Sequence, residues 1–117
     1  MAIPLLTAGQ VEHQILRISD ELDDETHRYA EVSELAADAE AAFKGVYHRA
    51  FIEAADADLP RVTVADREAR AHLAAEEEFR TWKILEARQD AGKQAQQSLR
   101  ARLDALRTIA ANIRAQS

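Results

Sequence analysis

Apolar side chains recur in two rows along residues 11–50, and the members of each row lie seven residues apart. One row consists of Ile15, Leu22, Tyr29, Ala36, Phe43 and Ala50. The other consists of Val11, Ile18, Glu25, Val32, Ala39 and Val46. Because a repeat of 3.5 residues keeps both rows on one face of a helix, they predict a coiled-coil packing seam. Beside the rows, three further residues widen the apolar strip: Leu35, Tyr47 and Phe51.

The two ends of this first helix carry their own signals. Thr7 and Gln10 have the spacing of a capping box, in which each side chain satisfies a backbone amide at a helix N-terminus. Residues 55–63 contain two aspartates and a proline, and the residue before a proline disfavours helical geometry. The sequence therefore predicts a helix over about residues 8–54 and a turn over about residues 55–63.

A second helical pattern begins at Thr63, which forms another capping box with Asp66. One seam row contains Ala71, Glu78, Leu85, Gly92, Leu99, Leu106 and Ile113. The other contains Ala75, Trp82, Gln89, Gln96, Leu103 and Ala110. These rows predict a continuous helix over about residues 64–115. Gly92 costs about 1 kcal/mol relative to alanine inside a helix, so it is expected to allow a close approach or a bend.

Two long helices joined by a short turn make the predicted fold class all-α. We expect a long antiparallel helical hairpin, coiled-coil-like, that forms a single domain over residues 1–117. The seam of its second helix is thin in the middle and buries little apolar area, so the hairpin is expected to assemble into an oligomeric helical bundle. The expected oligomer interface comprises Trp82, Leu85, Leu99, Leu103, Leu106 and Ile113.

Composition and charge narrow the possible functions. The chain contains no cysteine, which excludes disulfides and thiol chemistry. No apolar run reaches membrane-spanning length and no signal peptide is visible, so a soluble cytoplasmic protein without a membrane partner is expected. Residues 1–78 carry 18 acidic and 7 basic side chains, whereas residues 79–117 carry 3 acidic and 8 basic ones. This asymmetry indicates either a segment that faces a polyanion or two oppositely charged helices that pair.

Catalytic patterns are weak. The acidic runs at residues 20–25 and 76–78 lack two inward-facing pairs of the kind that hold magnesium in helical hydrolases. The four histidines do not complete the Glu-x-x-His sets of di-iron bundles. Serines lack a nucleophile elbow or a partnered base. We therefore expect a non-enzymatic protein with no catalytic residues, no metal, no cofactor and no small-molecule substrate.

Basic and aromatic residues remain as candidates for nucleic-acid binding. Single-strand-binding proteins combine cations that follow the phosphates with aromatic rings that stack on bases. The expected contacts are Arg80, Lys83, Arg88, Lys93 and Arg100. Trp82 and Phe43 fall on the apolar seams, so their spacing favours a core role over stacking on bases. Binding would then rest mainly on phosphate contacts.

Three segments resemble small helical proteins encoded by phages of actinobacteria. They are AFKGVYHRAF, with Lys44, Tyr47 and Arg49, then TVADREARAH, with Thr63 and Arg67, and LRARLDALRT, which runs from Leu99 to Thr108. More remotely, this layout is similar to the UvsY-type recombination mediators of T-even phages. That resemblance implies a helical homo-oligomer that binds single-stranded DNA and helps to load a recombinase.

Two hypotheses follow from the sequence. The first is a phage accessory protein for DNA recombination or replication, which binds single-stranded DNA weakly as a homo-oligomer. The second is a helical protein–protein interaction or assembly module, such as a modulator of a host or phage protein, with no role in nucleic-acid binding.

Overall fold

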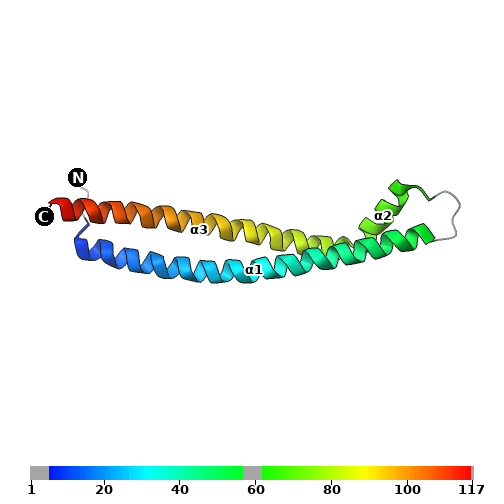
Figure 1. Ribbon diagram of the computed structural model, residues 1–117, viewed down its shortest axis with the longest axis horizontal. Coiled ribbons are helices and arrows are strands. Elements are labelled where there is room, and N and C mark those ends of the chain that lie inside the picture. Colours follow the sequence, from blue (N-terminus) through cyan, green and yellow to red (C-terminus); the bar gives the residue numbers. More distant parts are fainter. Residues whose placement is uncertain (1–5, 57–61, 117) are drawn as a thin grey trace. The chain divides into compact units, whose positions relative to one another are not determined.

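The computed structural model describes residues 6–56 and 62–116, which form three helices and no strand (Figure 1). Helix α1 spans Ala8–Asp56, α2 spans Val64–Ala74 and α3 spans Glu76–Gln116. The predicted all-α class is therefore confirmed, and α1 and α3 pair antiparallel as expected. Residues 57–61, the core of the predicted turn, lie outside the described residues. Within the described ranges, no helix combines the length and the apolarity needed to cross a membrane.

Both predicted capping boxes are present. At the start of α1, the Thr7 amide donates to Gln10 Oε1 over 2.9 Å, and the Gln10 amide donates to Thr7 Oγ1 over 3.2 Å. At the start of α2, the Thr63 amide donates to Asp66 Oδ2 over 3.3 Å and the Asp66 amide donates to Thr63 Oγ1 over 3.1 Å. These bonds satisfy amides that have no partner within the helix, so they fix where each helix begins.

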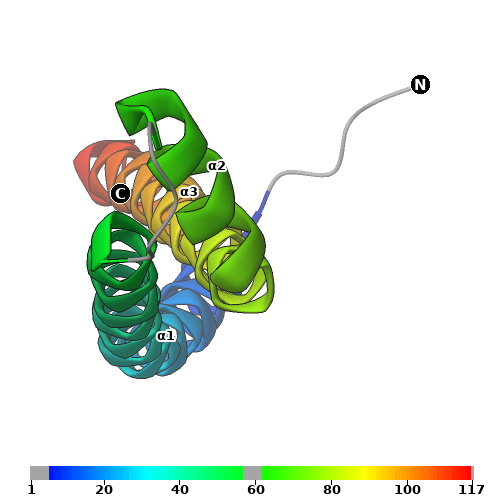
Figure 2. The same cartoon turned by 90° about the vertical axis from the view of Figure 1, so that its right-hand side faces the viewer.

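The prediction of one continuous helix over residues 64–115 is wrong at Ala75, where α2 ends and α3 begins. Ala75 has φ −104° and ψ 17°, and α2 turns away from the axis of α3 (Figure 2). The Ala75 amide still bonds to Ala71 O, and the Phe79 amide still bonds to Ala75 O. No proline or glycine causes this bend, which sets it apart from most helix kinks. Because Ala71 and Ala75 are both fully buried, we attribute the bend to the packing of α2.

The predicted seams are confirmed at every position. All residues of the four seam rows are buried or half-buried in the structure. Of the three residues expected to widen the α1 strip, Tyr47 and Phe51 are half-buried but Leu35 is 54% exposed. Leu35 stays exposed because the one partner helix covers only the two seam rows. Tyr47 has a second neighbour, since its ring lies 5.1 Å from the ring of His72 in α2.

The contacts of the chain group it into two compact units. Unit 1 comprises the described residues of 1–30 and 91–117, and unit 2 comprises those of 31–90. Each unit is therefore built from one segment of α1 and an antiparallel segment of α3, and unit 2 also contains α2.

Unit 1 has an aliphatic core. Its buried members are Val11, Ile18, Leu99, Leu103 and Leu106, with Ile15, Leu22, Ala110 and Ile113 packed against them. The leucines of α3 that were expected at an interface between chains are buried within one chain in this arrangement, and the interface itself stays a prediction. They are covered by α1 of the same chain, because the seam of α1 matches theirs in spacing. Burying a leucine side chain contributes roughly 1.5–3 kcal/mol, so this core accounts for the pairing of the two helices in unit 1.

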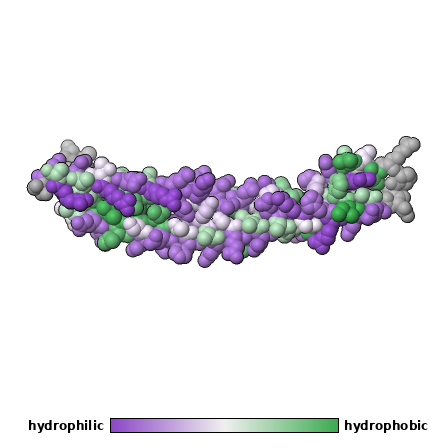
Figure 3. Space-filling model, in the orientation of Figure 1, coloured by the Kyte–Doolittle hydropathy of each residue, from purple (hydrophilic) through white to green (hydrophobic). Residues whose placement is uncertain are grey.

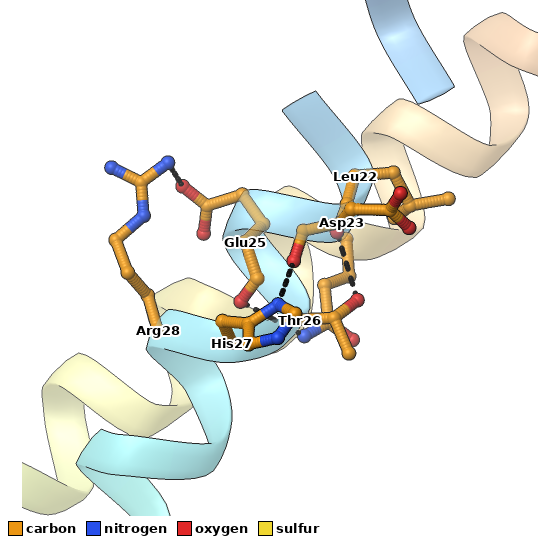
Figure 4. Close-up of polar contacts among 7 residues, drawn as sticks. Leu22, Asp23, Glu25, Thr26, His27 and Arg28 are labelled. Carbon is orange, nitrogen blue, oxygen red and sulfur yellow. Dashed lines mark hydrogen bonds and ion pairs between the residues drawn. The ribbon is translucent and has the colours of Figure 1, made fainter. Parts of the chain in front are cut away.

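Polar residues occupy the seam of unit 1 next to its core. Gln96 is 7% exposed and donates from Nε2 to Glu25 O over 3.4 Å. The Glu25 side chain pairs with Arg28 at 2.9 Å (Figure 4), which explains how a charged residue is tolerated in a seam row.

A Cβ on Gly92 would lie 3.4 Å from Tyr29 Cδ2. Tyr29 therefore packs directly over the Gly92 position, where a Cβ would make ordinary van der Waals contact with its ring.

Unit 2 has an aromatic core. Phe43 lies at its centre, with ring distances of 5.4 Å to Trp82, 5.3 Å to Phe79 and 5.7 Å to Tyr47. Trp82 is half-buried and stacks on Phe43 at an interplanar angle of 25°. Its predicted partial burial in the seam is therefore confirmed. Leu85, the other member of the expected interface in unit 2, is half-buried as well.

Candidate interaction surfaces

The five predicted nucleic-acid contacts are all exposed, but they do not form one strip. Arg80 and Lys83 lie on the side of α3 away from the seam. Arg88 flanks the seam on one side, since it precedes the seam residue Gln89. Lys93 and Arg100 flank it on the other side, since they follow Gly92 and Leu99. Arg80, Lys83, Arg88 and Lys93 therefore project outward in different directions, because their spacings of three and five residues rotate them around the helix.

A different set of cations does share one side of α3. We define the edge row as Lys93, Arg100, Arg107 and Arg114. Each member is exposed and directly follows a residue of the Gly92–Ile113 seam row. Since seven residues make two turns of a coiled coil, the four side chains lie one above another along a single edge of unit 1. Figure 3 shows purple, hydrophilic side chains beside the green surface of this unit.

The segment of α1 that borders the edge row is rich in hydroxyl groups. Unit 1 is aligned by the contacts of Glu25 with Gln96 and of Tyr29 with the Gly92 position. Extended along both helices, this alignment places Thr26 between Lys93 and Arg100, and it places Ser19 between Arg100 and Arg107. Of the carboxylates of α1 in unit 1, Glu12 belongs to this bordering row, next to Arg107. Cations and small hydroxyl side chains thus alternate along most of the edge.

The interactions of the edge row are few. Among the described residues, Lys93 and Arg100 make no ion pair or hydrogen bond through their side chains. Arg107 is 3.8 Å from Asp104, and both side chains are largely exposed. Exposed pairs of this kind contribute about 0–1 kcal/mol. Arg114 Nε donates to Ala110 O of its own helix over 3.5 Å. Lys93, Arg100 and Arg107 can therefore reach an anion at little cost.

The opposite edge of unit 1 has mixed charge. It carries Glu21 and Arg28 from α1 and Arg102 from α3, and Glu21 also pairs with Arg17 at 3.4 Å. Residues 1–30 contain six carboxylates and two arginines, whereas residues 91–117 contain one carboxylate and five cations. The net charge of unit 1 is therefore zero, and its positive side is the edge row. Opposite charges therefore share this unit, while one edge keeps its cations exposed, and both explanations of the charge asymmetry stay predictions.

The acidic run of α1 lies beside two side chains that bond to backbone carbonyls of their own helix. Figure 4 shows Thr26 Oγ1 donating to Leu22 O over 2.8 Å and His27 Nδ1 at 2.8 Å from Asp23 O. In the part of the chain that the structure describes, no group of three or more acidic or histidine side chains is placed to hold a metal ion. The run therefore forms an exposed acidic face of the helix.

Unit 2 presents a second surface, which we call the outer face of α3. A shallow groove there is lined by Glu76, Phe79, Arg80, Lys83, Ile84 and Ala87. Phe79 is 40% exposed and Ile84 is 48% exposed. Lys83 Nζ lies 4.3 Å from the centroid of Trp82 and 3.2 Å from Glu86 Oε1. Apolar and charged side chains are therefore interleaved on this face.

Unit 2 is otherwise acidic. Residues 31–90 contain 14 carboxylates and 8 cations, so the whole net charge of −6 belongs to this part of the sequence. Apolar surface also covers α2 (Figure 3), where Val64 and Leu73 are exposed. Trp82 is stacked on Phe43 and covered by Lys83, so its ring is not presented to a base. Unit 2 is suited to a protein partner better than to a polyanion.

Comparisons with known proteins give no further guide to these surfaces. No protein-family model, no curated protein and no solved structure matches the chain significantly.

Proposed function

We propose that this protein is a non-enzymatic accessory protein that binds single-stranded nucleic acid along the edge row of unit 1. The observation that supports this proposal is the alignment of Lys93, Arg100, Arg107 and Arg114 on one edge, where the side chains of Lys93 and Arg100 make no ion pair among the described residues. The row spans about 21 residues of helix, or roughly 32 Å. Cations along a line of this length can follow a phosphate backbone, and the hydroxyl of Ser19 can donate to a phosphate oxygen.

Binding of this kind is expected to be weak and indifferent to base sequence. The edge row lacks aromatic rings, which contribute about 1–3 kcal/mol per stacked base in other single-strand-binding proteins. Affinity then comes from counterion release, with a salt slope of about −0.7 for each phosphate contact on a single strand. Four cations give a slope no steeper than about −3. Self-association would multiply these contacts. The resemblance to UvsY-type mediators extends the proposal to loading of a recombinase in phage recombination.

Fluorescence anisotropy of a labelled oligo-dT strand at low salt tests the proposal. Replacing Lys93 and Arg100 together by glutamine should weaken binding about tenfold and flatten the salt slope by about one to two. Arg102→Gln is the matched control, because it removes one cation from the opposite edge of the same helix, and it should leave binding nearly unchanged. Absence of any binding by the wild-type protein at low salt would overturn the proposal, as would equal losses in the edge-row and control variants.

The outer face of α3 favours a second function, that of a helical protein–protein interaction module. Its groove combines exposed apolar and charged residues in an acidic unit, which suits a helical partner. This function needs no nucleic acid. The circular dichroism spectra of the Lys93/Arg100 double glutamine variant and of Arg102→Gln should match the wild-type spectrum. Matching spectra show that a loss of nucleic-acid binding is not caused by a loss of helical structure.

A further inference from the structure

The bend at Ala75 interrupts a stretch of sequence that favours one continuous helix. Residues 72–78 contain only alanine, leucine, histidine and glutamate, and alanine has the highest helix propensity of all residues. Hydrogen bonds from the Ala75 amide to Ala71 O and from the Phe79 amide to Ala75 O already span the bend. Straightening it requires changes of about 40° in φ and about 60° in ψ at Ala75 alone. The cause of the bend therefore lies outside the local sequence.

The alignment of the seams in unit 2 locates that cause. Gln89 Nε2 donates to Ser33 Oγ over 3.1 Å, and Ser33 follows the seam residue Val32, so Val32 and Gln89 share a layer of the seam. Because the helices are antiparallel, each further layer lies seven residues later in α1 and seven residues earlier in the other helix. The layers are Val32 with Gln89, Ala39 with Trp82, Val46 with Ala75, and then Glu53 with Glu68.

A layer of two glutamates is unfavourable in a seam, because burial penalises each charge and facing carboxylates repel each other. Glu53 and Glu68 are both exposed in the structure. Other side chains are buried at this end of the unit. Ala54 is 6% exposed, Phe51 is half-buried, and Arg67 is half-buried with its Nε buried and without a hydrogen-bond partner among the described residues. Helix α2 has therefore left the seam and packs toward the side of α1 that carries Phe51 and Ala54.

We propose that α2 is a lid over Phe51, which Glu53 and Glu68 hold closed and which opens when α2 and α3 straighten at Ala75 into one helix. Phe51 lies outside both seam rows, as does Leu35, which is 54% exposed. A straight helix that follows the seam would therefore uncover the Phe51 ring. The lid belongs to unit 2 alone, so it is independent of the nucleic-acid binding proposed for unit 1.

Each position of the lid is opposed by different groups. The closed position keeps Ala75 outside the usual helical dihedral angles and leaves Arg67 Nε buried without a partner, which is costly for a polar group. The open position removes both costs, but it brings Glu53 and Glu68 together and exposes Phe51. A change in the charge of one layer is therefore expected to move the whole of α2, as in other elements with two discrete arrangements.

Replacing both Glu53 and Glu68 by leucine tests the lid, because an apolar layer extends the seam. In the NMR spectra of this variant, the residual dipolar couplings of α2 and α3 should fit one straight helix, and the Cα chemical shift of Ala75 should move to its helical value. The wild-type couplings should define two helix directions. A soluble paramagnetic agent should broaden the ring protons of Phe51 more strongly in the variant than in the wild type.

Charge reversal tests the same layer without adding apolar surface. Glu53→Lys alone and Glu68→Lys alone each place opposite charges in the layer, so the couplings should shift toward those of a straight helix. The double variant E53K/E68K places two cations there and should remain bent like the wild type.

A matched control replaces Glu34 and Glu77 by leucine. Both residues are exposed and lie outside the seam rows of unit 2, so this variant has the same composition as the first but should keep the bend. The proposal would be overturned by a Glu53 and Glu68 leucine variant that stays bent, by a control that straightens, or by a double reversal that straightens as much as the single reversals.

Discussion

Units 1 and 2 use the same seven-residue repeat for different purposes. In unit 1 the seam is aliphatic, its core residues are nearly completely buried, and its charges balance. In unit 2 the seam is built from aromatic rings and alanines, and much of its apolar surface remains exposed on α2 and on the outer face of α3. The repeat determines which residues face the partner helix, whereas the residues beside the seam determine the surface that each unit presents. Unit 1 therefore presents cations beside a closed core, and unit 2 presents an incomplete apolar surface.

The largest expected effect is a loss of stability in unit 1. Leu103→Ala should lower the free energy of unfolding by about 3 kcal/mol, within the roughly 2–5 kcal/mol range for a buried leucine, because a cavity replaces contacts with α1. Urea unfolding followed by circular dichroism measures this change. Trp82, the only tryptophan, lies in unit 2, so its fluorescence transition should move less than the circular dichroism transition. Coincident shifts of both transitions would show that the units unfold as one.

A smaller effect is expected in unit 2 when its aromatic centre is removed. Phe43→Ala deletes contacts with three rings. It should destabilise the protein by about 2 kcal/mol, below the roughly 3–5 kcal/mol of a fully buried phenylalanine, because Phe43 is only half-buried. The fluorescence transition of Trp82 should move more than the circular dichroism transition, the reverse of the Leu103 variant. An unchanged emission spectrum of Trp82 would contradict the observed stacking.

The smallest effect concerns the cap of α2. Hydrogen bonds from Thr63, first from its side chain and then from its backbone, hold the pKa of Asp66 below its ordinary value of 3.8. A carboxyl with a lowered pKa adds stability above its ordinary value and loses this contribution as the pH falls through its folded value. Thr63→Ala should therefore destabilise the protein by about 1 kcal/mol at neutral pH. The difference from the wild type should shrink below pH 3.8, as measured by urea unfolding at several pH values. A difference that stays constant with pH would contradict the role of Asp66.

Local signals in the sequence predicted most of the fold. Capping boxes at Thr7 and Thr63 and the seam rows depend on residues close together in sequence, so they could be identified directly. The bend at Ala75 could not be predicted, because neither a proline nor a glycine marks it. The packing of Leu103 and Leu106 against α1 of the same chain could not be predicted either, because spacing shows that a face is buried but not which helix covers it.

Part of the candidate site was also within reach of the sequence. Lys93 and Arg100 were identified, but Arg107 and Arg114 were not included as contacts. The four cations of the edge row are spaced seven residues apart, and this spacing is the signal that points to Arg107 and Arg114. It places the cations on one edge only when the seam residue before each of them is known to be buried. Arg80 and Lys83 were grouped with them by proximity in sequence, although the helix turns them toward a different surface.

The pairing of Tyr29 with Gly92 also bears on how the two helices find each other during folding. A seven-residue repeat matches itself after a shift of seven, so a chain built from it has several nearly equivalent alignments in which it can be trapped. In unit 1, a shift of one repeat would move Tyr29 from Gly92 onto Leu99, where its ring would meet a leucine side chain in place of a glycine. The thin, polar part of the seam thus discriminates against misaligned pairs, which the leucines alone would tolerate.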